Sequence, residues 1–173
     1  MQHLFESDSK FTRFLTAVFD LILLSVLTCA MIATVVCAGV ALTALYAVLL
    51  KRIRNEEAEI SKSFFRAIRE DFRLSVPAEL LLLVDGALLA VIRYALIAET
   101  LVFSPAVFML LCIAAVFLTA LLSWLFPLLG RFDNTFSRHV SNAVRLAIGN
   151  LPVTVLMTFV NLLPFLFVTL FPA

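Results

Sequence analysis

Glycine is scarce in this chain: there are four in 173 residues, scattered at Gly39, Gly86, Gly130 and Gly149. A phosphate-binding loop needs glycines close together, because its backbone must approach the phosphates closely. The sequence also contains no P-loop, no dinucleotide-binding fingerprint and no HExxH pattern. These absences exclude the common nucleotide-driven and zinc-hydrolase enzymes. We expect a protein that is not an enzyme, with no catalytic residues and no cofactor.

Cysteine and charge are also in short supply. The three cysteines, Cys29, Cys37 and Cys112, lie in apolar segments at spacings that match no zinc or redox motif, so no metal site is expected. Charged residues make up 14% of the chain, whereas soluble domains carry about a quarter. The net charge of +1 provides no basic field for nucleic acid, and no nucleic-acid partner is expected.

Hydrophobic residues, by contrast, make up 63% of the chain, and the mean hydropathy is +1.09. A soluble domain of this length cannot bury so much apolar surface. We therefore predict an all-α, polytopic transmembrane helical bundle, with residues 1–173 forming a single transmembrane domain. A spanning helix needs about 20 apolar residues. The apolar runs predict five spans, at residues 15–33, 37–50, 76–97, 105–129 and 151–170, with long connections at 51–75 and 130–150.

The first two predicted spans come from one apolar run, Phe14 to Leu50, in which Asp20 is the only charged residue. A single helix of that length would extend about 55 Å, almost twice the hydrocarbon thickness of about 30 Å. We therefore expect a tight turn near residues 34–39 and a short second span, anchored at the interface by Lys51 and Arg52. The run is also far longer than the core of a signal peptide, so the first helix is expected to be retained.

Positive charge is distributed unevenly among the connections. Of the 13 Lys and Arg residues, all but Arg93 fall in the N-terminal segment or in the connections 51–75 and 130–150. By the positive-inside rule these segments are cytoplasmic. The sequence thus predicts a protein of the cytoplasmic membrane, with its N-terminus in the cytoplasm and the C-terminus of this chain outside.

The two long connections carry apolar residues at every fourth position, a spacing typical of an amphipathic helix. The two sets are Ile60, Phe64, Ile68 and Phe72, and Phe136, Val140, Val144 and Ile148. We predict two amphipathic cytoplasmic helices, lying in the inner membrane interface or docked on the protein. Their arginines form the candidate surface for a partner or for anionic lipid. These are Arg66, Arg69, Arg73, Arg131, Arg138 and Arg145.

Four stretches, LFESDSKFTRFLTAVFDLILL, GVALTALYAVLLKRIRNEEAEISKSFFRAIREDFR, GRFDNTF and NLLPFL, occur in an order and spacing that resemble the YesL family of uncharacterised bacterial membrane proteins. The resemblance covers nearly the whole chain. Family members are usually longer and end with a further helix, which implies that this chain lacks a sixth span. The family has no established activity. Its association with carbohydrate importers and sugar-degrading enzymes implies a link to sugar uptake.

The polar stretch from Gly130 to Asn150 contains Asp133, Ser137 and His139, the residue types of a hydrolytic triad. On a helix, however, residues two apart face different sides, so Ser137 and His139 cannot form the required hydrogen bond. We expect Asp133 or Asn134 to cap the following helix. His139 is expected on its solvated polar face.

Four polar residues within the predicted spans are candidates for function. Asp85 lies near the middle of its span, where a carboxylate costs at least about 2.5 kcal/mol unless it is paired, protonated or facing water. Asn161, midway along the last span, is its expected hydrogen-bond partner, because Arg93 is about 12 Å further along the helix. Asp20 is expected to be solvated at the inner interface, near Arg13 or Arg131, with a role in packing and orientation. A structural role for Asp85 in helix packing stays open beside a functional one.

Two functions are compatible with these observations. The first is an accessory or interaction protein linked to carbohydrate uptake, whose basic helices dock on the membrane subunit of an ABC importer or on anionic lipid. The alternative is a small transporter or channel-like subunit that carries a solute past Asp85. The scarcity of intramembrane charge and of helix-breaking glycine pairs favours the first.

Overall fold

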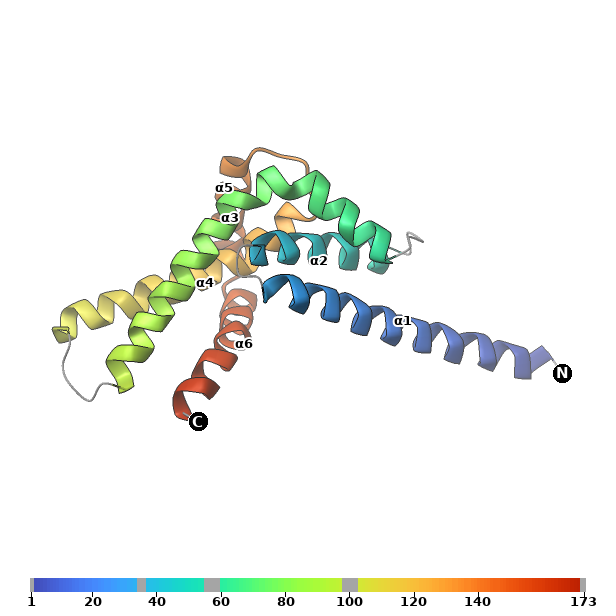
Figure 1. The fold of residues 1–173 in the computed structure, drawn as a ribbon, viewed down its shortest axis with the longest axis horizontal. Helices are drawn as coiled ribbons and strands as arrows, with labels where there is room; N and C mark the ends of the chain where they lie inside the picture. The colour runs from blue at the N-terminus through green and yellow to red at the C-terminus, as the bar shows by residue number, and fades with distance from the viewer. Residues whose placement is uncertain (1, 34–36, 55–59, 98–102, 172–173) are drawn as a thin grey trace.

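The computed structural model is helical in each element that it describes. It describes residues 2–33, 37–54, 60–97 and 103–171, and side chains from Leu15 onward. The helices are α1 (Gln2–Ile32), α2 (Ala38–Ile53), α3 (Ile60–Ile97), α4 (Pro105–Leu129), α5 (Phe136–Gly149) and α6 (Leu151–Leu170), arranged as Figure 1 shows. By length and composition α1 (over Leu15–Ile32), α3, α4 and α6 can cross a membrane. The predicted all-α membrane protein is therefore confirmed.

The outer faces of these helices are apolar. α1 exposes Phe19 (65%), and α6 exposes Leu156 (64%) and Phe167 (65%); α6 buries only Thr154 and Thr158. Such continuous apolar surface is rare on soluble monomers and is typical of helices that face lipid. Which membrane holds the protein, and on which side each terminus lies, stay predictions.

α2 is shorter than these four helices and more deeply packed. Its 16 residues extend about 24 Å, less than the hydrocarbon thickness of about 30 Å. Its buried face consists mainly of small residues, among them Ala41, Ala44 and Ala47. Small side chains let helix backbones approach closely, and α2 packs against α1, α3 and α4. α2 thus holds the neighbouring helices together.

Both predicted amphipathic helices are docked on the protein by their apolar faces. In the first half of α3, Ile60, Phe64 and Ala67 are buried with the alanines of α2. In α5, Ala143 is fully buried, and Val140 and Val144 pack with it against α4. The last residue of each predicted stripe is exposed: Phe72 by 47% and Ile148 by 64%.

The first amphipathic segment and the span that follows it form one continuous helix. Sequence patterning places Pro77 near the start of a separate span, whereas the structure places it inside α3. Proline lacks an N–H and clashes with the preceding turn, which bends a helix without ending it when the flanking residues are packed. Figure 1 shows this bend part-way along α3.

A contact between Gly39 and Glu79 joins the start of α2 to α3. The backbone N–H of Gly39 donates a hydrogen bond to Oε2 of Glu79, so α2 runs antiparallel to the first part of α3. The spans predicted from the sequence put residue 39 at the outer end of one span and residue 79 near the inner end of another. The contact gives neither residue a depth in the membrane, so the order of crossings stays a prediction. Residues 34–36 of the expected turn lie outside the described residues, and Gly39 lies within α2.

Gly130, which follows α4, lies in close contact with the backbone of α2. A Cβ at this position would lie 2.7 Å from the backbone N of Ala47 and 2.8 Å from the carbonyl oxygen of Thr43. Backbone atoms cannot rotate away as the tip of a side chain can, so the two helices would have to move apart.

We therefore expect Gly130→Ala to cost about 1–3 kcal/mol of stability, the usual range for overpacking. Gly86→Ala is the matched control, because a Cβ there has no heavy atom within 4 Å and alanine favours a helix over glycine by about 0.5–1 kcal/mol. Thermal unfolding in detergent measures both. An equal or higher melting temperature for Gly130→Ala would contradict the close α2–α4 packing.

Candidate functional site

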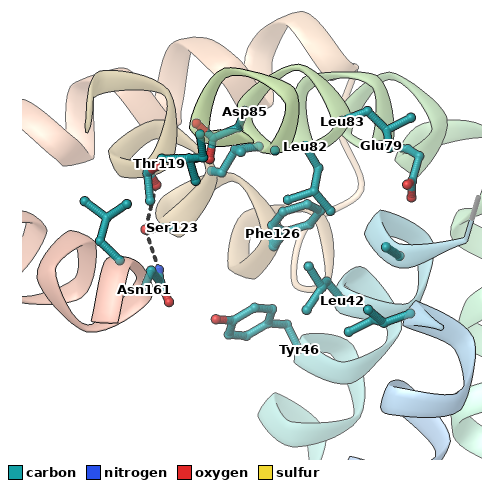
Figure 2. Close-up of a pocket in the computed structure, with 16 residues that line it drawn as sticks. Leu42, Tyr46, Glu79, Leu82, Leu83, Asp85, Thr119, Ser123, Phe126 and Asn161 are labelled. Carbon is teal, nitrogen blue, oxygen red and sulfur yellow. Dashed lines mark hydrogen bonds between the residues drawn. The ribbon is translucent and has the colours of Figure 1, made fainter. Parts of the chain in front are cut away.

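A cavity of about 450 Å³ lies where α2, α3, α4 and α6 meet. Its walls are mostly apolar, including Leu42, Leu82 and Phe126. Six polar side chains interrupt these walls, and Figure 2 shows how they lie around the space. They are Tyr46, Glu79, Asp85, Thr119, Ser123 and Asn161. An apolar cavity with a few convergent polar groups is the usual form of a small-molecule site.

Asp85 is held by α4. Its side chain is only 5% exposed, and its Oδ2 accepts a hydrogen bond of 3.0 Å from Oγ1 of Thr119. The expected partner, Asn161, lines the same cavity but donates through Nδ2 to Oγ of Ser123 at 2.8 Å, the contact that is dashed in Figure 2. The predicted direct pairing of Asp85 with Asn161 is therefore wrong. The two side chains instead form hydrogen bonds with two different hydroxyls, those of Thr119 and Ser123, which lie one turn apart on α4.

The two hydroxyls are fixed by their own helix. Thr119 Oγ1 lies 2.9 Å from the carbonyl oxygen of Ala115, so its single proton is shared between that oxygen and Asp85. Ser123 Oγ donates to the carbonyl oxygen of Thr119 at 2.7 Å. Because that uses its only proton, Ser123 must accept from Asn161, which identifies Nδ2 as the amide atom that faces it.

Glu79 is the residue that sequence reasoning missed. It is 6% exposed, and its Oε2 accepts from the N–H of Gly39 in the first turn of α2. The N-cap residue of α2, Cys37, makes no side-chain hydrogen bond. Glu79 therefore supplies from another helix the anion that a helix N-terminus favours. The sequence did contain a signal for it, because Glu79 is a second acidic residue in the apolar run that contains Asp85. Its position near the predicted membrane interface kept this residue from standing out.

Each of the two carboxylates keeps one oxygen unused. Glu79 Oε1 and Asp85 Oδ1 are buried and have no hydrogen-bond partner among the described residues. Buried carboxylate oxygens without partners are costly, so these two oxygens are unused acceptors, on residues that line the cavity, for a proton, a cation or a hydroxyl group. In the described part of the chain no group of three or more His, Cys, Asp or Glu residues is placed to hold a metal ion.

The other two polar candidates lie away from Asp85. Asp20 forms an ion pair with Arg52, and its side chain is 18% exposed. The partner shown is Arg52 at the end of α2, because α1 and α2 run side by side; of the two expected neighbours, the side chain of Arg13 lies outside those that the structure describes, and Arg131 is exposed in the segment after α4. Arg93 is partly buried, and its Nε has no hydrogen-bond partner within the described residues.

The structure corrects two expectations for the polar stretch before α6. His139 is not solvated but 1% exposed, because it faces inward when α5 docks on α4. The N-cap of α5 is Thr135, not Asp133 or Asn134; Oδ1 of Asn134 accepts instead from the N–H of Thr135 at 3.3 Å. Ser137 is exposed while His139 is buried, so the triad-like residues are not brought together.

The candidate docking arginines stand on the exposed surface. All six are exposed, because the docked apolar faces of α3 and α5 turn their charged faces outward. They are Arg66, Arg69, Arg73, Arg131, Arg138 and Arg145. Arg66 and Arg69 also border a shallow cavity of about 540 Å³ with Phe65 and Glu70. In Figure 1 the first half of α3 and α5 both lie toward the upper edge of the molecule.

Part of this chain is similar to a known protein family. Residues 16–92 match a family model described as "Protein of unknown function, DUF624". The match includes the apolar part of α1, α2, and most of α3 with Glu79 and Asp85, but not α4, α5 or α6. No curated protein and no solved structure matches the chain. The chain is thus similar to an uncharacterised family and is an integral membrane protein of unknown activity.

The buried imidazole of His139 leads to a prediction on pH dependence. Burial lowers its pKa below the usual 6.5, and hydrogen bonds to the backbone of Phe132 and Asn134 and the charge of Asp133 only partly oppose this. The imidazole of the unfolded chain therefore binds a proton near pH 6.5, whereas the imidazole of the folded protein stays neutral at that pH. Stability is full above that pH and falls as the pH drops toward the lowered pKa.

We expect the melting temperature of the wild type in detergent to fall between about pH 7 and pH 5. The fall should be smaller in His139→Gln, which keeps a polar side chain without the titration. The comparison of the two proteins over the same pH range corrects for other titrating groups. Parallel pH profiles would contradict a buried, neutral His139.

Proposed function

We propose that the protein is a small transporter or channel-like subunit, not an enzyme, whose cavity between α2, α3, α4 and α6 receives a polar solute. The observation that carries this proposal is the pair of acidic residues that line this cavity, Glu79 and Asp85. Each is about 95% buried, and each has one carboxylate oxygen without a partner among the described residues. Intramembrane acids are costly and usually mark a substrate or proton pathway.

The alternative of a purely structural Asp85 is less well supported by this geometry. A carboxylate that serves only helix packing would be expected to satisfy both oxygens within the bundle. Thr119 satisfies one of them, and does so with a proton that it shares with its own helix. The remaining oxygen has no partner among the described residues, and Asp85 lines a cavity of about 450 Å³, which is large enough for a small organic molecule.

A second candidate function has its own supporting observation, the six outward arginines of α3, α5 and the segment between α4 and α5. In this role the protein is an accessory that docks on the membrane subunit of an ABC importer or on anionic lipid, as basic surfaces near a membrane do. Its link to carbohydrate uptake rests on the family resemblance alone.

Reconstitution into liposomes tests the first function. We expect wild-type vesicles to take up at least one of three radiolabelled probes, glycerol, glucose or a linear diamine, faster than empty liposomes. Asp85→Asn keeps an acceptor for Thr119 but removes the charge, and should slow that uptake by at least about tenfold. Asp133→Asn, which removes an exposed charge outside the cavity, should leave it unchanged.

The same preparations separate the two functions. If no probe crosses faster than in empty liposomes, the transporter proposal fails. If, in addition, an importer membrane subunit co-purifies with the wild type and is lost when Arg66 and Arg138 are changed to Glu, the accessory role is supported.

A further inference from the structure

We propose that the cavity is a binding site for an organic cation of the linear diamine class, with one ammonium group at Asp85 and the other at Glu79. The proposal rests on the role of the cavity as a solute site and specifies the chemistry of that solute. Binding and transport are separate measurements, so the two proposals can fail independently.

The charge of the cavity selects a cation. Its lining includes two acidic side chains and no Lys, Arg or His among the described residues. The nearest arginines along the same helix are Arg73, about 9 Å before Glu79, and Arg93, about 12 Å beyond Asp85. Arg73 is exposed, and Arg52 is already paired with Asp20. An anionic solute would add a third negative charge without a counter-charge, whereas an ammonium group offsets the cost of burying each carboxylate.

The hydrogen bonds of the two carboxylates leave matching positions for two ammonium groups. Asp85 is anchored through Oδ2 by Thr119, and Glu79 through Oε2 by Gly39. Each therefore holds a defined orientation, and its second oxygen, Oδ1 or Oε1, is buried without a partner among the described residues. An ammonium group has donors only, so it complements these acceptors and forms charge-assisted hydrogen bonds. Orientation fixed before binding lowers the entropic cost of the complex.

The spacing and the walls favour an unbranched chain between the two cationic ends. Asp85 lies six positions after Glu79, which corresponds to about 9 Å along α3. Leu42, Leu82 and Phe126 line the space between them. An alkyl chain buries its methylene groups against such walls, whereas the ring hydroxyls of a sugar would lose hydrogen bonds to water there. The extended chain of 1,6-diaminohexane matches this spacing.

Isothermal titration calorimetry of the purified full chain in nanodiscs tests the site with three probes. They are 1,6-diaminohexane, hexylamine and 1,6-hexanediol, which share one chain and carry two, one and no cationic ends. We expect the diamine to bind at least about tenfold more tightly than hexylamine, and the diol not to bind detectably. Glu79→Gln and Asp85→Asn should each reduce the diamine affinity to that of hexylamine.

The controls keep the result interpretable. Both substitutions preserve an acceptor for Gly39 or Thr119, and a melting curve on each sample verifies folding. Asp133→Asn should bind the diamine as the wild type does. Equal affinity for the diamine and the diol, or unchanged diamine binding in both cavity variants, overturns the proposal. Diamine binding in the absence of flux of all three probes in liposomes would support the site while rejecting the transporter function.

Discussion

The arrangement of this protein depends on the carboxylate of Glu79 at the N-terminus of α2. The first turn of a helix leaves N–H groups without intrahelical partners, and the side chain of Cys37 accepts from none of them. Glu79 reaches across from α3 to accept from Gly39, where the absence of a side chain lets the two helices touch: a Cβ would lie 2.9 Å from Oε2 and 3.0 Å from Cα of Glu79. The contact fixes this end of α2 against the bent helix that also bears Asp85.

With α2 fixed in this way, the cavity follows from the packing around it. α2 contributes Leu42 and Tyr46 to the wall, and α4 approaches its backbone at Gly130. α6 is held on α4 by Asn161 with Ser123 and by Trp124 with Thr154 at 2.9 Å. Figure 2 shows the result, a space between these helices with Asp85 and Glu79 toward opposite ends, to which the end of α1 also contributes Ile32. One oxygen of the Glu79 carboxylate thus accepts the hydrogen bond that fixes α2. The other has no partner among the described residues, on a residue that lines the cavity.

The sequence was sufficient for the features that depend on periodicity and composition, and insufficient for those that depend on a tertiary neighbour. Hydropathy predicted the helical membrane protein, and the four-residue spacing from Phe64 and from Phe136 predicted apolar faces that do pack. Asp85 stood out because it is charged and central in an apolar run. Its partner could not be predicted, because Thr119 and Asn161 are comparable hydrogen-bonding residues on two different helices. His139 was misplaced because the side of α5 that docks on α4 includes it, and Glu79 was missed because its function is to cap a helix 40 residues earlier in the chain.

Hydrogen exchange of the Gly39 amide tests most directly whether Glu79 holds α2. This N–H precedes the first intrahelical hydrogen bond of α2, which Ala41 donates to Cys37, and Glu79 is its acceptor. We predict slow exchange in the wild type and in Glu79→Gln, which keeps an acceptor oxygen, and exchange at least about tenfold faster in Glu79→Leu, which has none. Equal exchange rates in all three proteins would show that Glu79 does not hold α2, and would contradict this origin of the cavity.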